Sequence, residues 1–160
     1  ENGIVCLHEN CQTWGGQSCR HSLRLLEEID SPALKLVFDT GNPFSMHHVA
    51  GEPPYSYQNA LKFFQQVRSH VEYLHVKDGH WAGDGSEYTF PGEGLGNVTE
   101  ILREINEHKM DIPISIEPHV AVVFHDPKIT TTTQERWDTF IKYGKDLVKM
   151  AGEAGIVCNP

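Results

Sequence analysis

Short apolar runs rich in β-branched residues alternate four times along the chain with longer segments that show helical spacing. Each run is short and bounded by turn or polar residues, which is typical of buried strands. The runs cover residues 3–7, 34–38, 71–76 and 112–116. The segments with helical spacing cover residues 22–29, 57–71, 98–105 and 133–151. This alternation predicts an α/β fold in which βα units surround a parallel sheet.

The four units are not separated by any Pro- or Ser-rich linker, so we expect a single domain over residues 1–160. A chain of 160 residues is long enough to bury a substantial core. No apolar run approaches the roughly 18 residues of a bilayer span, and the first residues do not resemble a signal peptide. The four cysteines form no C-x-x-C pair, which favours reduced thiols and a cytoplasmic protein.

The charge balance bears on the partners of the protein. With neutral histidines the formal net charge is −9, from 22 acidic and 13 basic residues. Binding to nucleic acid needs clustered lysines and arginines to neutralise phosphates, whereas the basic residues here are scattered. We therefore expect neither a nucleic acid nor a membrane as partner, but a small molecule that is neutral or bridged by a metal.

Each predicted strand ends near a residue that can bind a metal. Glu9 and Asp39 follow the first two runs. His75 lies near the end of the third run, and Glu117 follows the fourth. The carboxyl ends of parallel strands meet on one side of the fold, so these side chains should converge there. One such residue alone could cap a helix or reach solvent, but one in every strand favours a metal site.

The predicted ligands are mostly oxygen donors with one nitrogen donor. This set suits Mn²⁺ or Mg²⁺, and Co²⁺ and Zn²⁺ are alternatives. Further residues near the strand ends are candidates for contact with a substrate, namely Asn42, Lys77, Asp78, Trp81 and His119. Lys77 and Asp78 could bind a hydroxyl group, orient a ligand or form an ion pair at the rim. Trp81 could offer a ligand an apolar platform or pack within its own loop.

Short motifs follow the predicted strands in a fixed order. They are His8-Glu9-Asn10, Phe38-Asp39-Thr40-Gly41-Asn42, Leu74-His75-Val76-Lys77-Asp78, Pro91-Gly92-Glu93-Gly94 and Ser115-Ile116-Glu117-Pro118. Their order and position resemble the last four βα units of the xylose isomerase-like TIM barrels, (β/α)8 proteins of the superfamily that includes AP endonuclease family 2. That superfamily contains sugar isomerases and epimerases, with relatives among inosose dehydratases and endonuclease IV.

The resemblance implies that a divalent metal is held by Glu9, Asp39, His75 and Glu117. In the epimerase branch two glutamates also exchange a proton at a carbon next to a carbonyl, which would make Glu9 and Glu117 the catalytic pair. The implied activity is a metal-dependent isomerase or epimerase that acts on a sugar or sugar-like polyol. The alternatives are a lyase of the inosose dehydratase kind and a non-catalytic sugar- or metal-binding domain.

Two departures from the family pattern argue against DNA repair. Epimerases and endonuclease IV commonly carry a histidine three residues after the Asp ligand, where this chain has Asn42, whose amide cannot shuttle a proton. The Asp-Arg-His ligands of a trinuclear zinc nuclease do not follow His75 either.

The length conflicts with a complete barrel, which needs about 250 residues. Four βα units cannot close, and they leave two open sheet edges. We expect residues 1–160 to be the C-terminal half of a longer chain, supplying strands five to eight. A homo-oligomer that pairs these edges is the alternative.

Overall fold

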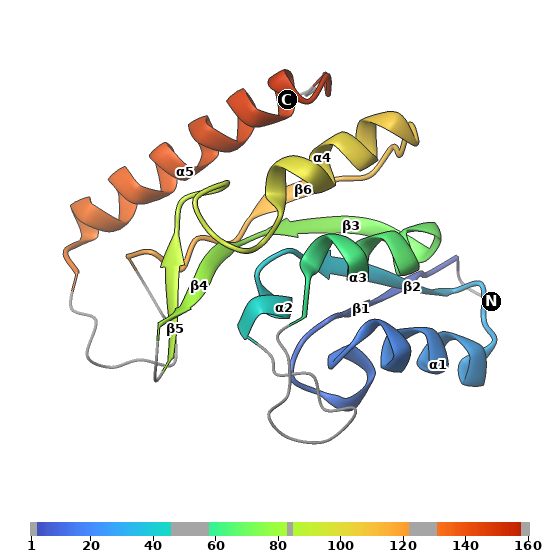
Figure 1. The fold of residues 1–160 in the computed structure, drawn as a ribbon. Helices are drawn as coiled ribbons and strands as arrows, with labels where there is room; N and C mark the ends of the chain where they lie inside the picture. Colours follow the sequence, from blue (N-terminus) through green and yellow to red (C-terminus); the bar gives the residue numbers. More distant parts are fainter. Residues whose placement is uncertain (1–2, 46–57, 83–84, 122–130, 158–160) are drawn as a thin grey trace.

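The computed structural model describes residues 3–45, 58–82, 85–121 and 131–157. A parallel sheet with strand order β1, β2, β3, β6 lies at its centre (Figure 1). The strands are β1 (Cys6–Glu9), β2 (Leu34–Asp39), β3 (Val71–Val76) and β6 (Ile114–Ile116). The main helices are α1 (Cys19–Ile29), α3 (Ala60–Val67), α4 (Val98–Glu107) and α5 (Thr133–Glu153). The predicted fourfold alternation of strand and helix is therefore confirmed.

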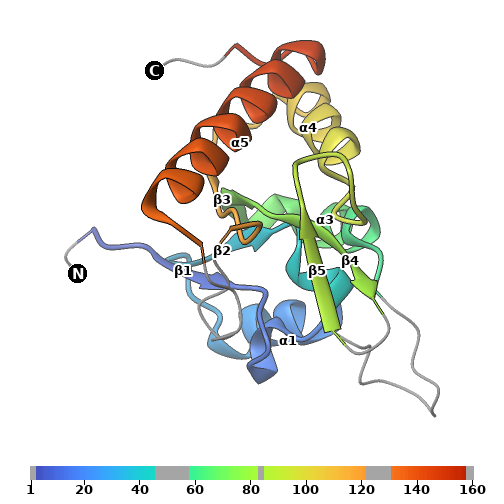
Figure 2. The same ribbon diagram turned by 90° about the vertical axis from the view of Figure 1, so that its left-hand side faces the viewer.

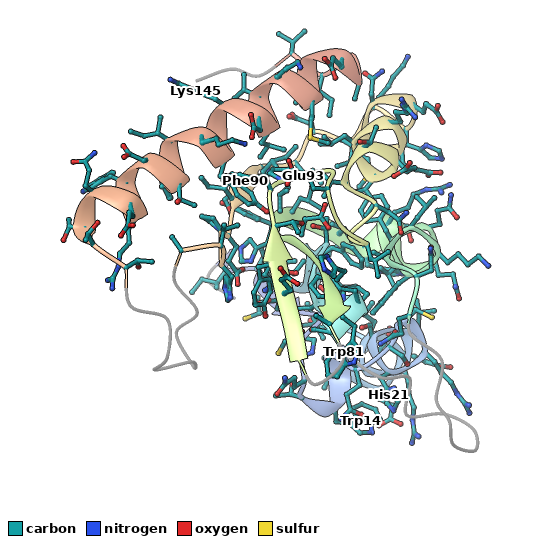
Figure 3. The ribbon with its side chains drawn as sticks, turned by 60° about the vertical axis from the view of Figure 1, so that its left-hand side comes forward. Trp14, His21, Trp81, Phe90, Glu93 and Lys145 are labelled. Carbon is teal, nitrogen blue, oxygen red and sulfur yellow. The ribbon has the colours of Figure 1, made fainter. Side chains whose placement is uncertain are left out.

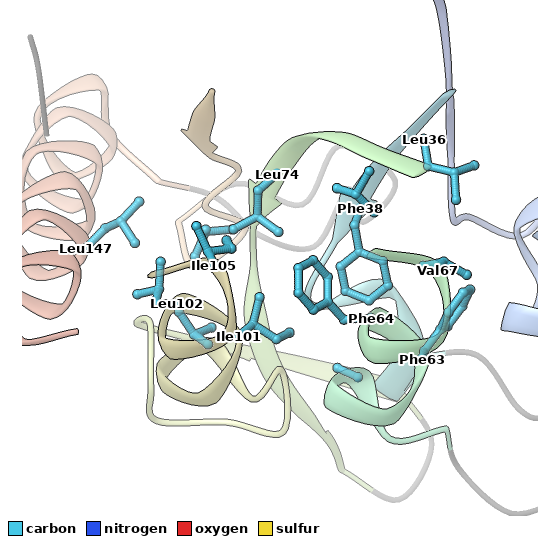
Figure 4. Packing of buried hydrophobic residues seen from close by; sticks show 14 of the residues in the cluster. Leu36, Phe38, Phe63, Phe64, Val67, Leu74, Ile101, Leu102, Ile105 and Leu147 are labelled. Carbon is cyan, nitrogen blue, oxygen red and sulfur yellow. The ribbon is translucent and has the colours of Figure 1, made fainter. Parts of the chain in front are cut away.

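The hydrophobic core lies between the sheet and the helices (Figure 4). Alternation along the strands sends Phe38 of β2 and Leu74 of β3 to the helix side, where both are almost fully buried. Phe38 meets Phe63 and Phe64 of α3 edge-on, with ring centroids 5.3 Å from each. The neighbouring residues of the same strands, Asp39 and His75, point to the opposite face. One face of the sheet is thus apolar, and the other carries the charged residues at its carboxyl end.

The sheet is strongly curved. Adjacent strands lie about 4.8 Å apart, so the outer strands of a flat four-stranded sheet would be separated by about 14 Å. Glu9 ends β1 at one edge and Glu117 follows β6 at the other, yet the metal-binding atoms of these residues lie within 4.8 Å of each other. Curvature of the sheet and the reach of the two glutamate side chains together close this gap.

Several element boundaries differ from those predicted. The first strand begins at Cys6 rather than at residue 3, because its pairing with β2 starts there. Helix α1 begins three residues earlier than predicted, after Ser18, whose hydroxyl accepts a hydrogen bond from the backbone of the first turn. Helix α3 begins after Asn59, whose side chain accepts a bond from the Lys62 N–H at 2.9 Å. A short 3₁₀ turn, η2 (Arg68–His70), connects α3 to β3.

Four elements were not predicted from the sequence. One turn of 3₁₀ helix, η1 (Trp14–Gly16), precedes α1, and a short helix, α2 (Asn42–Ser45), follows β2. After β3 the chain forms an antiparallel hairpin of β4 (Asp78–Ala82) and β5 (Gly85–Thr89) (Figure 2). In the sequence, the two residues between these strands are Gly83-Asp84, a recognised two-residue hairpin signal that could have revealed it.

Asp78 anchors the glycine loop that follows the hairpin. The residue is 1% exposed. Its Oδ1 accepts hydrogen bonds from the N–H groups of Gly79 and Gly96, both at 2.8 Å. Its Oδ2 accepts from Gly92 at 2.8 Å and Gly94 at 3.2 Å. A Cβ atom on Gly94 would lie 2.4 Å from the Gly79 carbonyl oxygen, so only glycine allows this approach.

We expect Asp78→Asn to destabilise the protein by about 2–4 kcal/mol, because the amide nitrogen cannot accept a bond and leaves buried N–H groups unpaired. The measurement is the free energy of unfolding by urea. The matched control is Asp111→Asn, which removes an exposed carboxylate and should change the stability by less than about 0.5 kcal/mol. Equal stability of the two variants would contradict the anchoring role.

Both open edges of the sheet expose apolar surface. Beside β6, the side chains of Trp137, Phe140, Ile141 and Val148 on α5 are 48–59% exposed. A groove of about 380 Å³ runs between Ile116 and the last three of these side chains. Beside β1, a groove of about 390 Å³ lies between Cys6 and Ile29. In the part of the chain that the structure describes, no helix is both long and apolar enough to cross a membrane.

This exposed surface predicts that the 160-residue chain self-associates when produced alone, because unpaired strand edges and contiguous apolar patches favour association. Sedimentation velocity is the measurement. Replacing Trp137 and Phe140 together by lysine should shift the distribution towards smaller species. A monodisperse monomer of the unmodified chain would contradict this prediction.

Candidate metal centre

The predicted ligands converge at the carboxyl end of the sheet. Glu9 and Asp39 are the last residues of β1 and β2, His75 is the penultimate residue of β3, and Glu117 directly follows β6. The strand register places Asp39 beside His75 on the neighbouring strand. One ligand atom from each of the four residues lies within 4.8 Å of those of the other three. A single ion can therefore reach all of them.

Asp39 is held from several sides. It is fully buried, and its Oδ1 accepts hydrogen bonds from the N–H groups of Gly41 at 2.8 Å and Asn42 at 2.7 Å. The side chain of Asn10 bonds both backbone groups of Asp39, at 2.6 Å to its N–H and 2.9 Å to its carbonyl. Burial raises the pKa of Asp39 to about 7, although Lys77 opposes the shift. Ionisation of this carboxylate therefore costs free energy unless further positive charge lies beside it.

Lys77 lies between two of the carboxylates. Its Nζ is 3.0 Å from Asp39 Oδ2 and 2.9 Å from Glu117 Oε1. Burial would lower the pKa of Lys77, but the attraction of Asp39 and the hydrogen bond with Glu117 raise it to about 12. Lys77 is therefore cationic at neutral pH.

Glu117 has partners on both oxygens. Besides Lys77, Oε1 contacts His119 Nε2 at 3.1 Å, and Oε2 contacts His75 Nδ1 at 3.0 Å. Burial would raise the pKa of Glu117, but the bonds from His119, His75 and Lys77 hold it well below its ordinary value. The hydrogen bond with Glu117 in turn raises the pKa of His75. Glu117 is thus firmly ionised.

Glu9 is oriented by Asn42. The Nδ2 of Asn42 donates a hydrogen bond to Glu9 Oε1 at 2.9 Å. The backbone N–H of the same residue bonds Asp39, so Asn42 connects two of the predicted ligands. An amide can make this contact because its N–H groups donate hydrogen bonds, although an amide cannot transfer a proton.

The charge of the cluster suits a divalent cation. Glu9, Asp39 and Glu117 bring three negative charges, and Lys77 compensates one of them. Apart from their contacts with Lys77 and Glu117, at 3.0 Å each, the buried atoms Asp39 Oδ2 and His75 Nδ1 have no hydrogen-bond partner in the part of the chain that the structure describes. Carboxylate oxygens together with one imidazole nitrogen are suitable ligands for Mg²⁺ or Mn²⁺.

The predicted substrate residues have different surroundings. Asn42, Lys77 and His119 each contact a predicted ligand directly. Asp78 instead binds the glycine loop through both of its oxygens, and a substrate contact of Asp78 stays a prediction. Trp81 is half-buried towards the tip of the hairpin, at the other end from Phe90 (Figure 3). A substrate contact of Trp81 stays a prediction.

Three supporting residues were missed by the sequence analysis. Asn10 clamps the backbone of Asp39 and could have been suspected only from its position directly after Glu9. Thr40 joins β2 to β3, because its hydroxyl donates to the Lys77 carbonyl at 2.6 Å and accepts from the Lys77 N–H at 3.1 Å. The ring of Tyr88 on β5 packs on His119, with 4.8 Å between centroids. These contacts join residues distant in sequence, so no local pattern reveals them.

A cavity adjoins the cluster. Its volume is about 440 Å³, within the range of small-molecule sites. Glu117 and His119 line it on one side, and Arg136, Thr139 and Phe140 of α5 line it on the other.

The fold has relatives among solved structures. A xylose isomerase domain protein from Planctomyces limnophilus superposes with a TM-score of 0.70 at 19% identity, over 96% of this chain and 49% of that one. For a xylose isomerase-like TIM barrel protein from Mycobacterium smegmatis in complex with magnesium, the TM-score is 0.67 at 16% identity, over 96% and 45%. For D-psicose 3-epimerase with D-tagatose from Clostridium cellulolyticum H10, it is 0.55 at 14% identity, over 88% and 45%.

This chain thus spans about half the length of these structures, and its fold is of the TIM-barrel type with about four βα units present. No curated protein matches its sequence. The sequence itself matches the xylose isomerase-like TIM barrels over residues 1–139, a stretch that contains the curved sheet and all four converging side chains. With fold and sequence in agreement over most of its length, the chain belongs to the xylose isomerase-like TIM barrel family.

Proposed function

We propose that Glu9, Asp39, His75 and Glu117 bind a divalent cation and that this site isomerises or epimerises a sugar or sugar-like polyol. The observation that carries the proposal is the convergence of one ligand atom from each residue within 4.8 Å, at the ends of all the parallel strands. The magnesium complex of the Mycobacterium smegmatis relative and the D-tagatose complex of the 3-epimerase support it. Mg²⁺ and Mn²⁺ are the ions we favour.

The chemistry follows from the arrangement of the carboxylates. A divalent cation held by Glu9, Asp39, His75 and Glu117 would polarise the hydroxyl and carbonyl oxygens of a substrate and so acidify the C–H bond at the carbon next to the carbonyl. Glu9 and Glu117 approach the centre from opposite edges of the sheet and can flank a substrate. One glutamate takes the proton from carbon and the other returns one. Return to the opposite face of the same carbon inverts its configuration, whereas return to the former carbonyl carbon, with transfer of the hydroxyl proton between the two oxygens, moves the carbonyl group.

Other side chains hold this pair in place. Asn42 orients Glu9, and His119 and Lys77 orient Glu117. Lys77 and His119 can also donate hydrogen bonds to substrate hydroxyl groups. Because Tyr88 packs on His119, the hairpin limits the positions that His119 can adopt.

The metal site predicts that Mn²⁺ or Mg²⁺ raises the thermal transition temperature of the protein, since a ligand that binds only the folded state stabilises it. Asp39→Asn should weaken Mn²⁺ binding by more than about tenfold. Loss of a residue that only supports a metal ligand already lowers the metal affinity by about tenfold or more, and loss of a ligand's charge should cost at least as much. Isothermal titration calorimetry measures the affinity. Asp138→Asn, which alters an exposed carboxylate on α5, is the matched control and should bind like the wild type.

The proposed proton transfer predicts that a hydrogen on the substrate carbon next to the carbonyl exchanges with solvent. Incubation of D-tagatose and other ketoses with the Mn²⁺-loaded protein in deuterated water should place deuterium next to the carbonyl, as observed by NMR. Glu117→Gln should slow this exchange by about a hundredfold or more while the protein stays folded, because the amide keeps the shape but accepts no proton. The loss of metal affinity in this variant should be modest.

The control for this experiment is Glu87→Gln, since Glu87 is an exposed hairpin carboxylate that pairs only with His80 among its described ion-pair partners. It should exchange protons like the wild type. A product lighter by one water molecule would indicate a dehydratase instead. Metal binding without any exchange over a panel of sugars and polyols would indicate a non-catalytic binding domain, and wild-type exchange in Glu117→Gln would remove Glu117 from the acid/base role.

A further inference from the structure

The side chain of Lys77 is confined inside the cluster. It is only 6% exposed. Its backbone is fixed by the two hydrogen bonds to Thr40, and its stem packs so closely on Gly41 that a Cβ there would lie 2.6 Å from Lys77 Cγ. The position of the ammonium group is therefore set by the ends of two strands. A lysine held in this way acts as a fixed charge, unlike a mobile surface lysine.

The carboxylates need this charge when no metal is bound. Glu9, Asp39 and Glu117 lie within 4.8 Å of one another, and Asp39 is fully buried. Like charges at such distances in a partly buried site repel strongly. Lys77 lies between Asp39 and Glu117, at 3.0 and 2.9 Å, and attracts both. It thereby keeps one oxygen of each carboxylate in place.

The same contacts place Lys77 in competition with a metal. Both hydrogen bonds to Asp39 Oδ1 come from backbone N–H groups, so Oδ2 is the oxygen that remains for a cation, and Lys77 already contacts it. A metal ion bound to Asp39 and Glu117 would share both residues with the ammonium group. Two neighbouring cations repel each other, which lowers the affinity for the metal.

We propose that Lys77 is the internal counter-ion of the metal-free centre, which holds Asp39 and Glu117 in their binding positions and sets the metal affinity by competing for the same carboxylates. This positioning role rests on the proposed metal site. It predicts two opposite effects of removing the charge: the metal-free protein loses stability, and the affinity for the metal rises. A residue that only fills space would not raise the metal affinity.

The test is Lys77→Met, which keeps the apolar stem and removes the charge. In the presence of EDTA, its transition temperature should fall by at least about 6 °C relative to the wild type, because loss of one partner of a buried ion pair leaves uncompensated charge. Calorimetry should show Mn²⁺ bound about tenfold more tightly or better. Lys35→Met is the matched control, since Lys35 pairs with Glu72 of the neighbouring strand at 3.7 Å, and it should change neither quantity.

A double variant separates charge from packing. Lys77→Met combined with Glu117→Gln removes one charge of each sign, so it should recover most of the metal-free stability that Lys77→Met loses. The stability of the double variant tests the counter-ion role even if Lys77→Met alone does not fold. A double variant as unstable as Lys77→Met overturns the proposal, as does a Lys77→Met protein with wild-type metal-free stability or with unchanged or weaker Mn²⁺ affinity. Failure of the wild type to bind any divalent cation would instead reject the proposed function, and the EDTA measurements would still decide the counter-ion role.

Discussion

The curvature of the parallel sheet is the constraint on which the candidate site depends. Strands β2 and β3 present apolar side chains to the helices, and Phe38 and Leu74 are buried there in one core with residues of α3 and α4. Curvature and the reach of the side chains together bring Glu9 and Glu117, from opposite edges, to the same centre. A flatter sheet would leave two separate pairs of polar residues, and neither pair alone would be a convincing metal site.

The strand ends are further fixed by side chains that bind backbone. Asn10 bonds both backbone groups of Asp39, Thr40 joins the ends of β2 and β3, and Asp78 collects the N–H groups of the glycine loop. Each of these contacts satisfies buried polar groups that would otherwise be costly. They also hold the charged residues rigidly, so that repulsion between the carboxylates is not relieved by movement of the backbone.

The two apolar edges belong to the same architecture. Strand β1 and helix α5 expose hydrophobic side chains at the borders of the sheet, and this chain covers about half the length of its solved relatives. The candidate centre itself lies within this chain, because all four predicted ligands come from the described strands and the residue after β6.

The sequence by itself determined the order of strands and helices and the identity of the four predicted ligands. Both are encoded locally: hydrophobic periodicity distinguishes strand from helix, and a charged residue at the end of an apolar strand is conspicuous. Helix starts at Ser18 and Asn59 were misplaced by a few residues, since a side-chain cap competes with periodicity at a boundary. Tertiary structure alone decided that Lys77 lies between two carboxylates, that Asn10 holds Asp39 and that Asp78 serves a loop. These partners are separated by 14–40 residues, and their meeting depends on the register and curvature of the sheet, which no local pattern specifies.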